Sequence, residues 1–220
     1  MNNKLLLLVL LLSMVANVFA VEVEIDGLWY EVLSKTNEAR IIQCKNNNNY
    51  SGDIEIPDEV TYNNVTYNVT TIGNGAFKRC NITSVKIPSS IKTIEYEAFY
   101  ENYSLTSVTI SNLESWCNIN FIGNPNPLFY AHHLYLNGEE VKDLIIPEGV
   151  TSVKQYAFAG ASYITSVKIP NSVTTIEEGA FYKCLEFSYI NIPSSIKSIG
   201  AGAFKECKNI KTVDIQSIED

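Results

Sequence analysis

The chain has 220 residues, and its 16 lysine and arginine residues are outnumbered by 24 aspartate and glutamate residues, giving a formal net charge of −8 at pH 7. Its lysines are scattered and form no basic patch for phosphate groups, so we expect no nucleic-acid partner. The sequence contains no glycine-rich phosphate loop, Ser-His-Asp order or Cys-x-x-Cys motif, so nothing in it indicates an enzyme.

The first 20 residues have the pattern of a secretory signal. Lys4 precedes an apolar run from Leu5 to Leu12, and the segment ends at Ala20 with small residues at the two positions that a signal peptidase reads. The run is short for a membrane span, and no later stretch is continuously apolar enough to span a bilayer. We expect a signal peptide at residues 1–20 cleaved after Ala20, no transmembrane segment in the mature chain, and a location outside the cell or on its surface. An uncleaved anchor is the alternative.

Residues 21–70 differ in pattern from the rest of the chain and predict short strands. Apolar and polar residues alternate on both sides of Asp26-Gly27, which is typical of two strands joined by a tight turn. The segment also contains Ile54-Glu55-Ile56-Pro57, the first copy of a signal that recurs later. Since the first coil of a stacked fold must hide its apolar end, we expect residues 21–70 to form a β-rich N-terminal cap.

Residues 71–220 contain one pattern repeated several times. Phe158, Phe181 and Phe204 follow one another at intervals of 23 residues, and each is preceded by alanine. Apolar positions that hold such a period indicate a solenoid, whose units bury their apolar faces only by stacking on copies of themselves. The fold class that we predict is therefore a repeat solenoid.

Each copy begins with a short alternating segment. In residues 166–169 the valine and isoleucine are expected to point inward, while Ser166 and Lys168 point to solvent. Pro170 then ends the strand because it has no N–H for a ladder. Stacked copies predict a parallel sheet on one wall, with the Ala-Phe segment forming a tight turn or one short helical turn on the opposite wall.

Three of the five cysteines share one position in the repeat. Cys80, Cys184 and Cys207 each lie three residues after the phenylalanine of their copy. We interpret this position as a buried slot for a small, weakly polar side chain. A bridge between Cys184 and Cys207, in neighbouring coils, stays open as an alternative.

The copy at residues 111–147 is long and irregular. Residues 112–117 predict a short helix with an asparagine or serine cap. Residues 134–144 predict a hairpin, because Asn137-Gly138 accepts the positive φ angles of a two-residue turn.

The repeat resembles the BspA-like branch of the leucine-rich repeat proteins, with a unit Leu-Thr-Ser-Val-x-Ile-Pro-x-Ser-Val-x-x-Ile-x-x-x-Ala-Phe-x-x-Cys. Residues 105–110, 164–173 and 190–207 match this unit most closely, and the resemblance extends from about Ile54 to the C-terminus. Ser111 and Gln216 depart from it by replacing proline. The resemblance implies a leucine-rich-repeat-like solenoid in secreted or cell-surface proteins, some of which are implicated in attachment to matrix proteins and to other microbes.

The outward positions of the predicted strands are the first candidate site. We expect them to form a continuous, mixed polar face of the kind that repeat proteins use to bind extended partners. The twelve residues are Ser84, Lys86, Ser107, Thr109, Asp143, Ile145, Ser166, Lys168, Tyr189, Asn191, Thr212 and Asp214. A merely solvated sheet face is the alternative, and Tyr189 and Ile145 are the positions that solubility explains least.

Aromatic residues of the irregular copy are the second candidate site. They could form a platform for a sugar ring or could pack the insertion onto the solenoid. The four residues are Trp116, Phe129, Tyr130 and Tyr135. His132 and His133 are the only histidines, and because neighbours on an extended segment point to opposite sides, we expect no metal, cofactor or catalytic role for them.

These patterns predict a non-catalytic binding module for an extracellular protein or glycan. The alternative is a structural repeat unit that docks another subunit through its C-terminal coil. This alternative arises because residues 213–215 form a predicted strand with little sequence after it to cover its edge.

Overall fold

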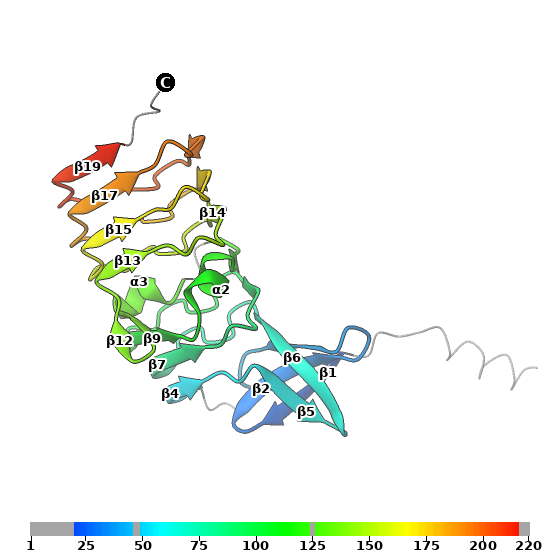
Figure 1. Cartoon of the computed structure of the whole chain (residues 1–220). Helices are drawn as coiled ribbons and strands as arrows, with labels where there is room; N and C mark the ends of the chain where they lie inside the picture. The colour runs from blue at the N-terminus through cyan, green and yellow to red at the C-terminus, as the bar shows by residue number, and fades with distance from the viewer. Residues whose placement is uncertain (1–19, 46–48, 124–125, 216–220) are drawn as a thin grey trace, which may run out of the picture.

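The computed structural model describes residues 20–45, 49–123 and 126–215, and the predicted secretory signal lies outside them except for Ala20. Figure 1 shows coils stacked in a column from β4 (Ser51–Glu55) to β19 (Thr212–Ile215), with longer antiparallel strands at the N-terminal end. Within the described ranges, no helix is both long and apolar enough to cross a bilayer.

The N-terminal strands join directly onto the column. β1 (Ala20–Ile25), β2 (Leu28–Leu33) and β3 (Glu38–Ile41) are antiparallel, and Asp26 and Gly27 form the predicted turn with φ angles of 49° and 84°. β5 (Glu59–Tyr62) forms a hairpin with β6 (Val65–Ile72), and β6 pairs in parallel with β3. The strands are present as predicted, while the cap role and its boundary at residue 70 stay predictions.

The predicted outward-facing strands form the first wall of the column, which we call the strand wall. Its first sheet has the order β12-β11-β9-β7-β4, and its second has the order β13-β15-β17-β19. The strands not yet located are β7 (Asn81–Ile87), β9 (Ser107–Ile110), β11 (Leu134–Leu136), β12 (Glu139–Glu140), β13 (Asp143–Ile145), β15 (Ser166–Lys168) and β17 (Tyr189–Ile192). The hairpin β11–β12 therefore interrupts the face that the sequence predicted to be continuous.

A second wall carries two-residue strands. β8 (Thr93–Ile94) and β10 (Asn120–Phe121) extend the sheet of β6, and β14 (Ser152–Val153), β16 (Thr175–Ile176) and β18 (Ser198–Ile199) form a separate parallel sheet. The second residue of each of these strands is apolar. Ile94, Phe121, Val153 and Ile176 are buried in the column, whereas Ile199 in the last coil is 47% exposed.

The third wall, which we call the turn wall, consists of the Ala-Phe turns. Backbone N–H groups of Tyr156, Phe158 and Gly160 donate to the next coil, to the oxygens of Glu178 (3.1 Å), Ala180 (2.8 Å) and Tyr182 (2.8 Å). The residues two before and two after the phenylalanine have positive φ angles, 56° at Tyr156 and 83° at Gly160. The same ladder recurs in the next coil, so this wall is as regularly bonded as a sheet.

Stacked phenylalanine rings fill the centre of the column. Phe181 lies 5.5 Å from Phe158 and 5.4 Å from Phe204 between ring centroids, with interplanar angles of 8° and 3°. Phe77 and Phe99 form a similar pair at 5.2 Å. The preceding alanines are buried, and their small size lets the backbone pass close to the rings.

The shared cysteine slot has a hydrogen-bonding role. The thiol of Cys184 donates to the Phe158 oxygen at 3.2 Å, and that of Cys207 donates to the Phe181 oxygen at 2.9 Å. Asn102, in the same slot, donates from Nδ2 to the oxygens of Phe77 (2.6 Å) and Phe99 (2.9 Å). All five cysteines are free, so the bridge left open by the sequence is absent.

The irregular copy contains the predicted helix and hairpin. In α2 (Leu113–Cys117), Oδ1 of Asn112 caps the helix by accepting from the Ser115 N–H at 2.7 Å. The hairpin turn has φ angles of 54° at Asn137 and 83° at Gly138. α3 (Leu128–Ala131) was not predicted, and it packs so closely on the next coil that a Cβ at Gly160 would lie 2.5 Å from the Phe129 Cα.

Candidate functional site: the strand face

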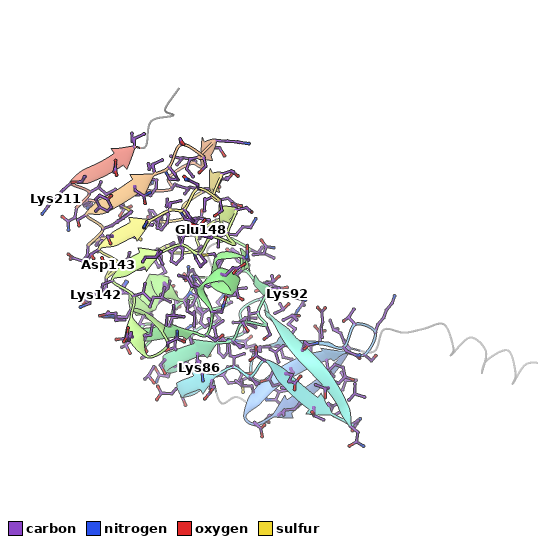
Figure 2. All side chains as sticks on the ribbon, in the orientation of Figure 1. Lys86, Lys92, Lys142, Asp143, Glu148 and Lys211 are labelled. Atoms are coloured by element: carbon purple, nitrogen blue, oxygen red, sulfur yellow. The ribbon has the colours of Figure 1, made fainter. Side chains whose placement is uncertain are left out.

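The outward side of the strand wall, which we call the strand face, carries eleven of the twelve predicted residues. Ser84, Ser107, Thr109 and Ser166 are half-buried, and the other seven are exposed. Figure 2 shows Lys86, Lys142 and Asp143 along this wall, with Lys92 and Glu148 away from it. The alternation of the strands thus places these side chains as predicted, whereas their role in binding stays a prediction.

Asn191 is the exception, and its predicted exposure was wrong. The residue is only 6% exposed, because its side chain lies along the neighbouring coil. Its Oδ1 accepts from the Ile169 N–H at 2.7 Å, and its Nδ2 donates to the Ile169 oxygen at 3.1 Å. β15 ends at Lys168, so the amide of Asn191 satisfies the main-chain groups that a longer ladder would have paired. Both ends of the amide are occupied, so Asn191 is not free to bind a ligand.

Two aspartates on the strand face are held by hydroxyl groups of the next coil. Asp53 accepts from Ser84 and Thr83, each at 2.7 Å, and Asp143 accepts from Ser166 and from Thr165. Hydrogen bonds from Ser84 and then Thr83 hold the pKa of Asp53 below its usual value. These contacts keep negative charge at fixed places on the face.

Other polar residues of the strand face are also paired between coils. Lys86 forms an ion pair with Glu55, and the Tyr189 hydroxyl donates to Asp214 at 3.4 Å. Such exposed pairs contribute little stability. These groups already bind one another. For this part of the strand face, solvation alone therefore explains why the residues are polar, and no ligand is needed.

Ile145 is the strand-face side chain that mere solvation explains least, because it is large and aliphatic, and Lys168 lies beside it. They are direct register partners on β13 and β15, and Ile145 is 63% exposed. Beside Ile145 lies a hollow of about 350 Å³ that continues onto the hairpin, where Leu136 and Val141 form an apolar floor. Three carboxylates, those of Glu139, Glu140 and Asp143, and the ammonium group of Lys142 line the same hollow. The break between the two sheets thus creates an apolar depression whose charged rim has three carboxylates and one lysine, and is negative on balance.

The predicted aromatic platform of the irregular copy does not exist as one cluster. Trp116 is 1% exposed and donates from Nε1 to the Ala157 oxygen at 3.0 Å, so it belongs to the core. Tyr135 lies on β11, with its ring 6.5 Å from His133. Phe129 and Tyr130 lie on α3 and contact each other at 5.9 Å. The packing alternative is correct for Trp116, and the other three residues divide between two walls.

The two histidines have separate partners. His132 ends α3 in the left-handed region, not on the extended segment that we expected, and its Nδ1 lies 3.1 Å from the Gly160 oxygen. His133 contacts Glu140, and this hydrogen bond lowers the pKa of the Glu140 carboxyl. Within residues 20–45, 49–123 and 126–215, no three His, Cys, Asp or Glu side chains are placed to hold a metal ion.

Two solved structures share this fold over most of the chain. A leucine-rich cell surface protein from Faecalibacterium prausnitzii is 28% identical with a TM-score of 0.58, and the match covers 90% of this chain and 55% of that one. The chain therefore spans about half the length of that protein. The leucine-rich repeat protein of T. pallidum is 18% identical with a TM-score of 0.53, over 88% of this chain and 82% of that one, and shows the fold alone.

A family model gives the assignment directly. The model for the BspA type leucine-rich repeat region matches six copies, over residues 52–126 and 131–219. A search among curated proteins finds no match. Repeat proteins of this kind offer extended surfaces for protein interaction and are typically not enzymes. The chain belongs to the BspA type leucine-rich repeat family.

Proposed function

We propose that the chain is a non-catalytic, adhesin-like interaction module that binds an extracellular protein through its strand face. The observation that carries this proposal is the pairing of Ile145 with Lys168, on a face where most other polar side chains are satisfied by neighbours. A large aliphatic side chain that is 63% exposed next to an apolar hollow is typical of an interface centre.

The chemistry of the hollow defines the kind of partner. An apolar side chain of the partner would enter between Ile145 and the hairpin, against Leu136 and Val141. Basic residues beside that anchor would face Asp143 and Glu139 on the rim. Since the chain carries a net charge of −8, we expect association to slow as salt screens the attraction.

Two observations support an extracellular location. The first 20 residues have the pattern of a secretory signal. A structural relative that is 28% identical is a cell surface protein. Retention at the surface or release from the cell would both bring the strand face to an extracellular partner.

The test is a binding screen of the chain against immobilised matrix proteins and a glycan array. A double variant, Ile145→Ala with Lys168→Ala, should weaken binding to a matrix protein at least tenfold. The matched control is Ile122→Ala with Lys92→Ala, because Ile122 is 46% exposed and both residues lie away from the strand wall.

A second set of variants tests the strand face as a whole. Tyr189→Ala, Lys168→Ala and Asp214→Ala together remove one exposed side chain from each of β15, β17 and β19 in the second sheet. Binding that is unchanged in both this triple variant and the Ile145 double variant would exclude the strand face as the site.

A second candidate function is assembly through the C-terminal coil. Among the described residues, β19 pairs only with β17, and its Val213 and Ile215 are 48% and 71% exposed. An unpaired strand edge with apolar side chains can accept a strand from another subunit. Concentration-dependent mass in light scattering that is abolished by Ile215→Lys would favour this function, and a monomer at all concentrations would reject it.

A further inference from the structure

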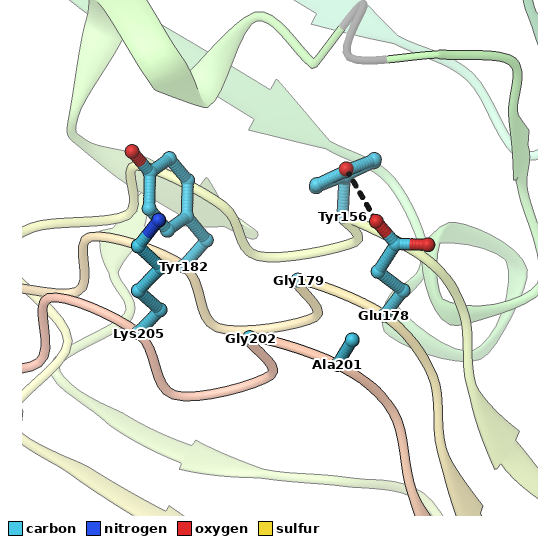
Figure 3. Close-up of a pocket in the computed structure, with 7 residues that line it drawn as sticks. All are labelled: Tyr156, Glu178, Gly179, Tyr182, Ala201, Gly202 and Lys205. Carbon is cyan, nitrogen blue, oxygen red and sulfur yellow. Dashed lines mark hydrogen bonds between the residues drawn. The ribbon is translucent and has the colours of Figure 1, made fainter.

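The turn wall contains a hollow on the side of the repeat that has no part in the strand face. Its cavity volume is about 320 Å³. Figure 3 shows Tyr182 and Lys205 on one side of it and Tyr156 with Glu178 on the other. Gly179 and Gly202 form its floor, and the lining residues come from three successive coils. At the usual spacing of stacked strands, three coils span about 10 Å.

The hollow exists because two successive coils have glycine at one repeat position. Tyr156, Gly179 and Gly202 each lie two residues before the phenylalanine of their coil and have positive φ angles. The ring of Tyr156 covers Gly179 so closely that a Cβ there would lie 2.3 Å from the ring. Gly179 has no side chain to cover Gly202 in the same way. The nearest atoms to a Cβ at Gly202 would be Lys205 Cβ at 3.6 Å and Lys205 Cδ at 3.9 Å, which are ordinary contacts. The open space over Gly202 is therefore the place of a missing side chain.

Hydrogen bonds orient the aromatic walls of the hollow. The Tyr156 hydroxyl donates to Glu178 at 3.1 Å, and the Tyr182 hydroxyl donates to Glu206 at 3.0 Å. The second Glu178 oxygen accepts a long hydrogen bond from the Gln155 amide at 3.5 Å, and Phe129 stacks on one face of the Tyr182 ring. A ligand would therefore meet the Tyr156 ring, the other side of the Tyr182 ring, the remaining lone pairs of the Glu178 carboxylate and the Lys205 ammonium. Lys205 forms no ion pair with any residue that the structure describes.

A band of aromatic rings continues from the hollow across the wall. Tyr182 stacks on Phe129 at 6.3 Å with an interplanar angle of 20°, and Phe129 contacts Tyr130 at 5.9 Å. Tyr130 in turn contacts Tyr103 at 5.8 Å, and Tyr103 is 80% exposed. The ammonium group of Lys183 lies 5.1 Å from the centre of the Phe129 ring. We call these four rings the aromatic band.

We propose that the hollow and the aromatic band bind an oligosaccharide, with one pyranose ring over Gly202. The C–H face of a pyranose packs on aromatic rings, and its hydroxyl groups both donate and accept hydrogen bonds. Glu178 supplies an acceptor for such hydroxyls and Lys205 a donor, beside the rings of Tyr156 and Tyr182. A few polar groups set among aromatic walls are typical of a small-ligand site.

A proline-rich peptide also packs on aromatic rings, but the polar groups favour a sugar. Such a peptide offers carbonyl acceptors and needs donors from the protein. Both tyrosine hydroxyls of the hollow already donate to carboxylates, which leaves Lys205 as a donor for a peptide carbonyl. The Glu178 carboxylate only accepts, so it suits the hydroxyl donors that a sugar carries and a proline-rich backbone lacks. The proposal is independent of the strand face, because its residues lie on another wall.

The experiment is a glycan array of defined oligosaccharides probed with the chain, followed by calorimetric titration of each disaccharide that binds. Two variants address the hollow. Ala201→Trp fills it from an exposed position, and Tyr182→Ala removes one aromatic wall. The control is the strand-face double variant Ile145→Ala with Lys168→Ala, and thermal melting of every variant establishes that it is folded.

We expect at least one disaccharide to bind, Ala201→Trp and Tyr182→Ala to weaken it at least tenfold, and the strand-face variant to bind it normally. Lys205→Ala should weaken it less, because only one hydrogen-bond donor is lost. Three results would overturn the proposal: no sugar binds the chain, sugar binding survives Ala201→Trp, or a proline-rich peptide binds the hollow while no sugar does.

Discussion

Replacing Phe181 by alanine should be among the most destabilising changes in the column. Its ring is fully buried between Phe158 and Phe204, with Phe187 at 5.8 Å as a third ring contact. Truncation of a buried phenylalanine costs about 3–5 kcal/mol. We expect the upper part of this range, because the rigid walls bonded on either side prevent the cavity from collapsing.

Phe204→Ala is the matched control for this prediction. Phe204 occupies the same repeat position, but it is half-buried and has two ring contacts, with Phe181 and Phe187. Its loss should cost about half as much, roughly 2 kcal/mol, because the ring is already partly hydrated.

Urea denaturation followed by circular dichroism measures both changes. With a slope of about 2 kcal/mol per M, a loss of about 4 kcal/mol moves the midpoint by roughly 2 M. Equal midpoint shifts for Phe181→Ala and Phe204→Ala, or a loss below about 1 kcal/mol for Phe181→Ala, would refute the reasoning from ring stacking.

Three further predictions concern the turns, the cysteines and the carboxylates. In the same urea assay, Gly160→Ala should destabilise the chain by more than Gly138→Ala. Both glycines have a φ of 83°, but only at Gly160 would the added Cβ meet α3. Equal losses of stability would contradict this prediction. Iodoacetamide should modify Cys207 before Cys184, as followed by mass spectrometry. Burial raises the pKa of the Cys184 thiol, whereas a hydrogen bond with Cys184 lowers the pKa of the half-buried Cys207 thiol. Modification of Cys184 first would reject this prediction. Burial of Glu177 acts to raise the pKa of its carboxyl, but hydrogen bonds from the preceding coil outweigh it and lower that pKa. The ionised carboxylate therefore stabilises the fold fully above its unfolded pKa of about 4.5, and this stabilisation is lost as the pH falls through the lower pKa of the folded state. Glu177→Gln should therefore reduce the fall in melting temperature between about pH 5 and pH 3, and an unchanged acid limb would count against this.

The period of the repeat predicted the walls because each coil contacts mainly its neighbours. A position that recurs every 23 residues along the sequence, such as Phe158 and Phe181, therefore becomes a column in space. The inward and outward positions of most strands followed from their alternation in the same way. The hairpin was also predictable, because Asn137-Gly138 specifies a local turn that needs no information from the rest of the chain.

Asn191 shows why the candidate site was predicted less well than the fold. Alternation along β17 gives its outward position, but its burial depends on where the neighbouring strand β15 ends. The slot that holds Asn102 and Cys184 shows a similar limit. The repeat predicted a small, weakly polar residue there, whereas the structure shows a donor to the phenylalanine oxygen of the preceding coil.

Only Phe129 and Tyr130 of the aromatic band were among the predicted site residues, and Tyr182 and Tyr103 were missed because the band's contacts join distant parts of the sequence. Phe129 reaches Tyr182 through α3, a helix in the irregular copy that no repeat position specifies. One signal was available in the sequence: Tyr182 and Tyr100 both directly follow the phenylalanine of their copies. Comparison of that position between copies would have indicated exposed aromatic residues on the turn wall.

The central claim is that a protein partner contacts the strand face, and hydroxyl-radical footprinting of the complex tests it most directly. With a matrix protein bound, Tyr189 and Ile145 should be oxidised several-fold more slowly than in the free chain. Tyr96, which is 54% exposed and lies outside the strand wall, should be oxidised at the same rate in both. Unchanged oxidation of Tyr189 and Ile145 in a chain that is saturated with its partner would contradict the account.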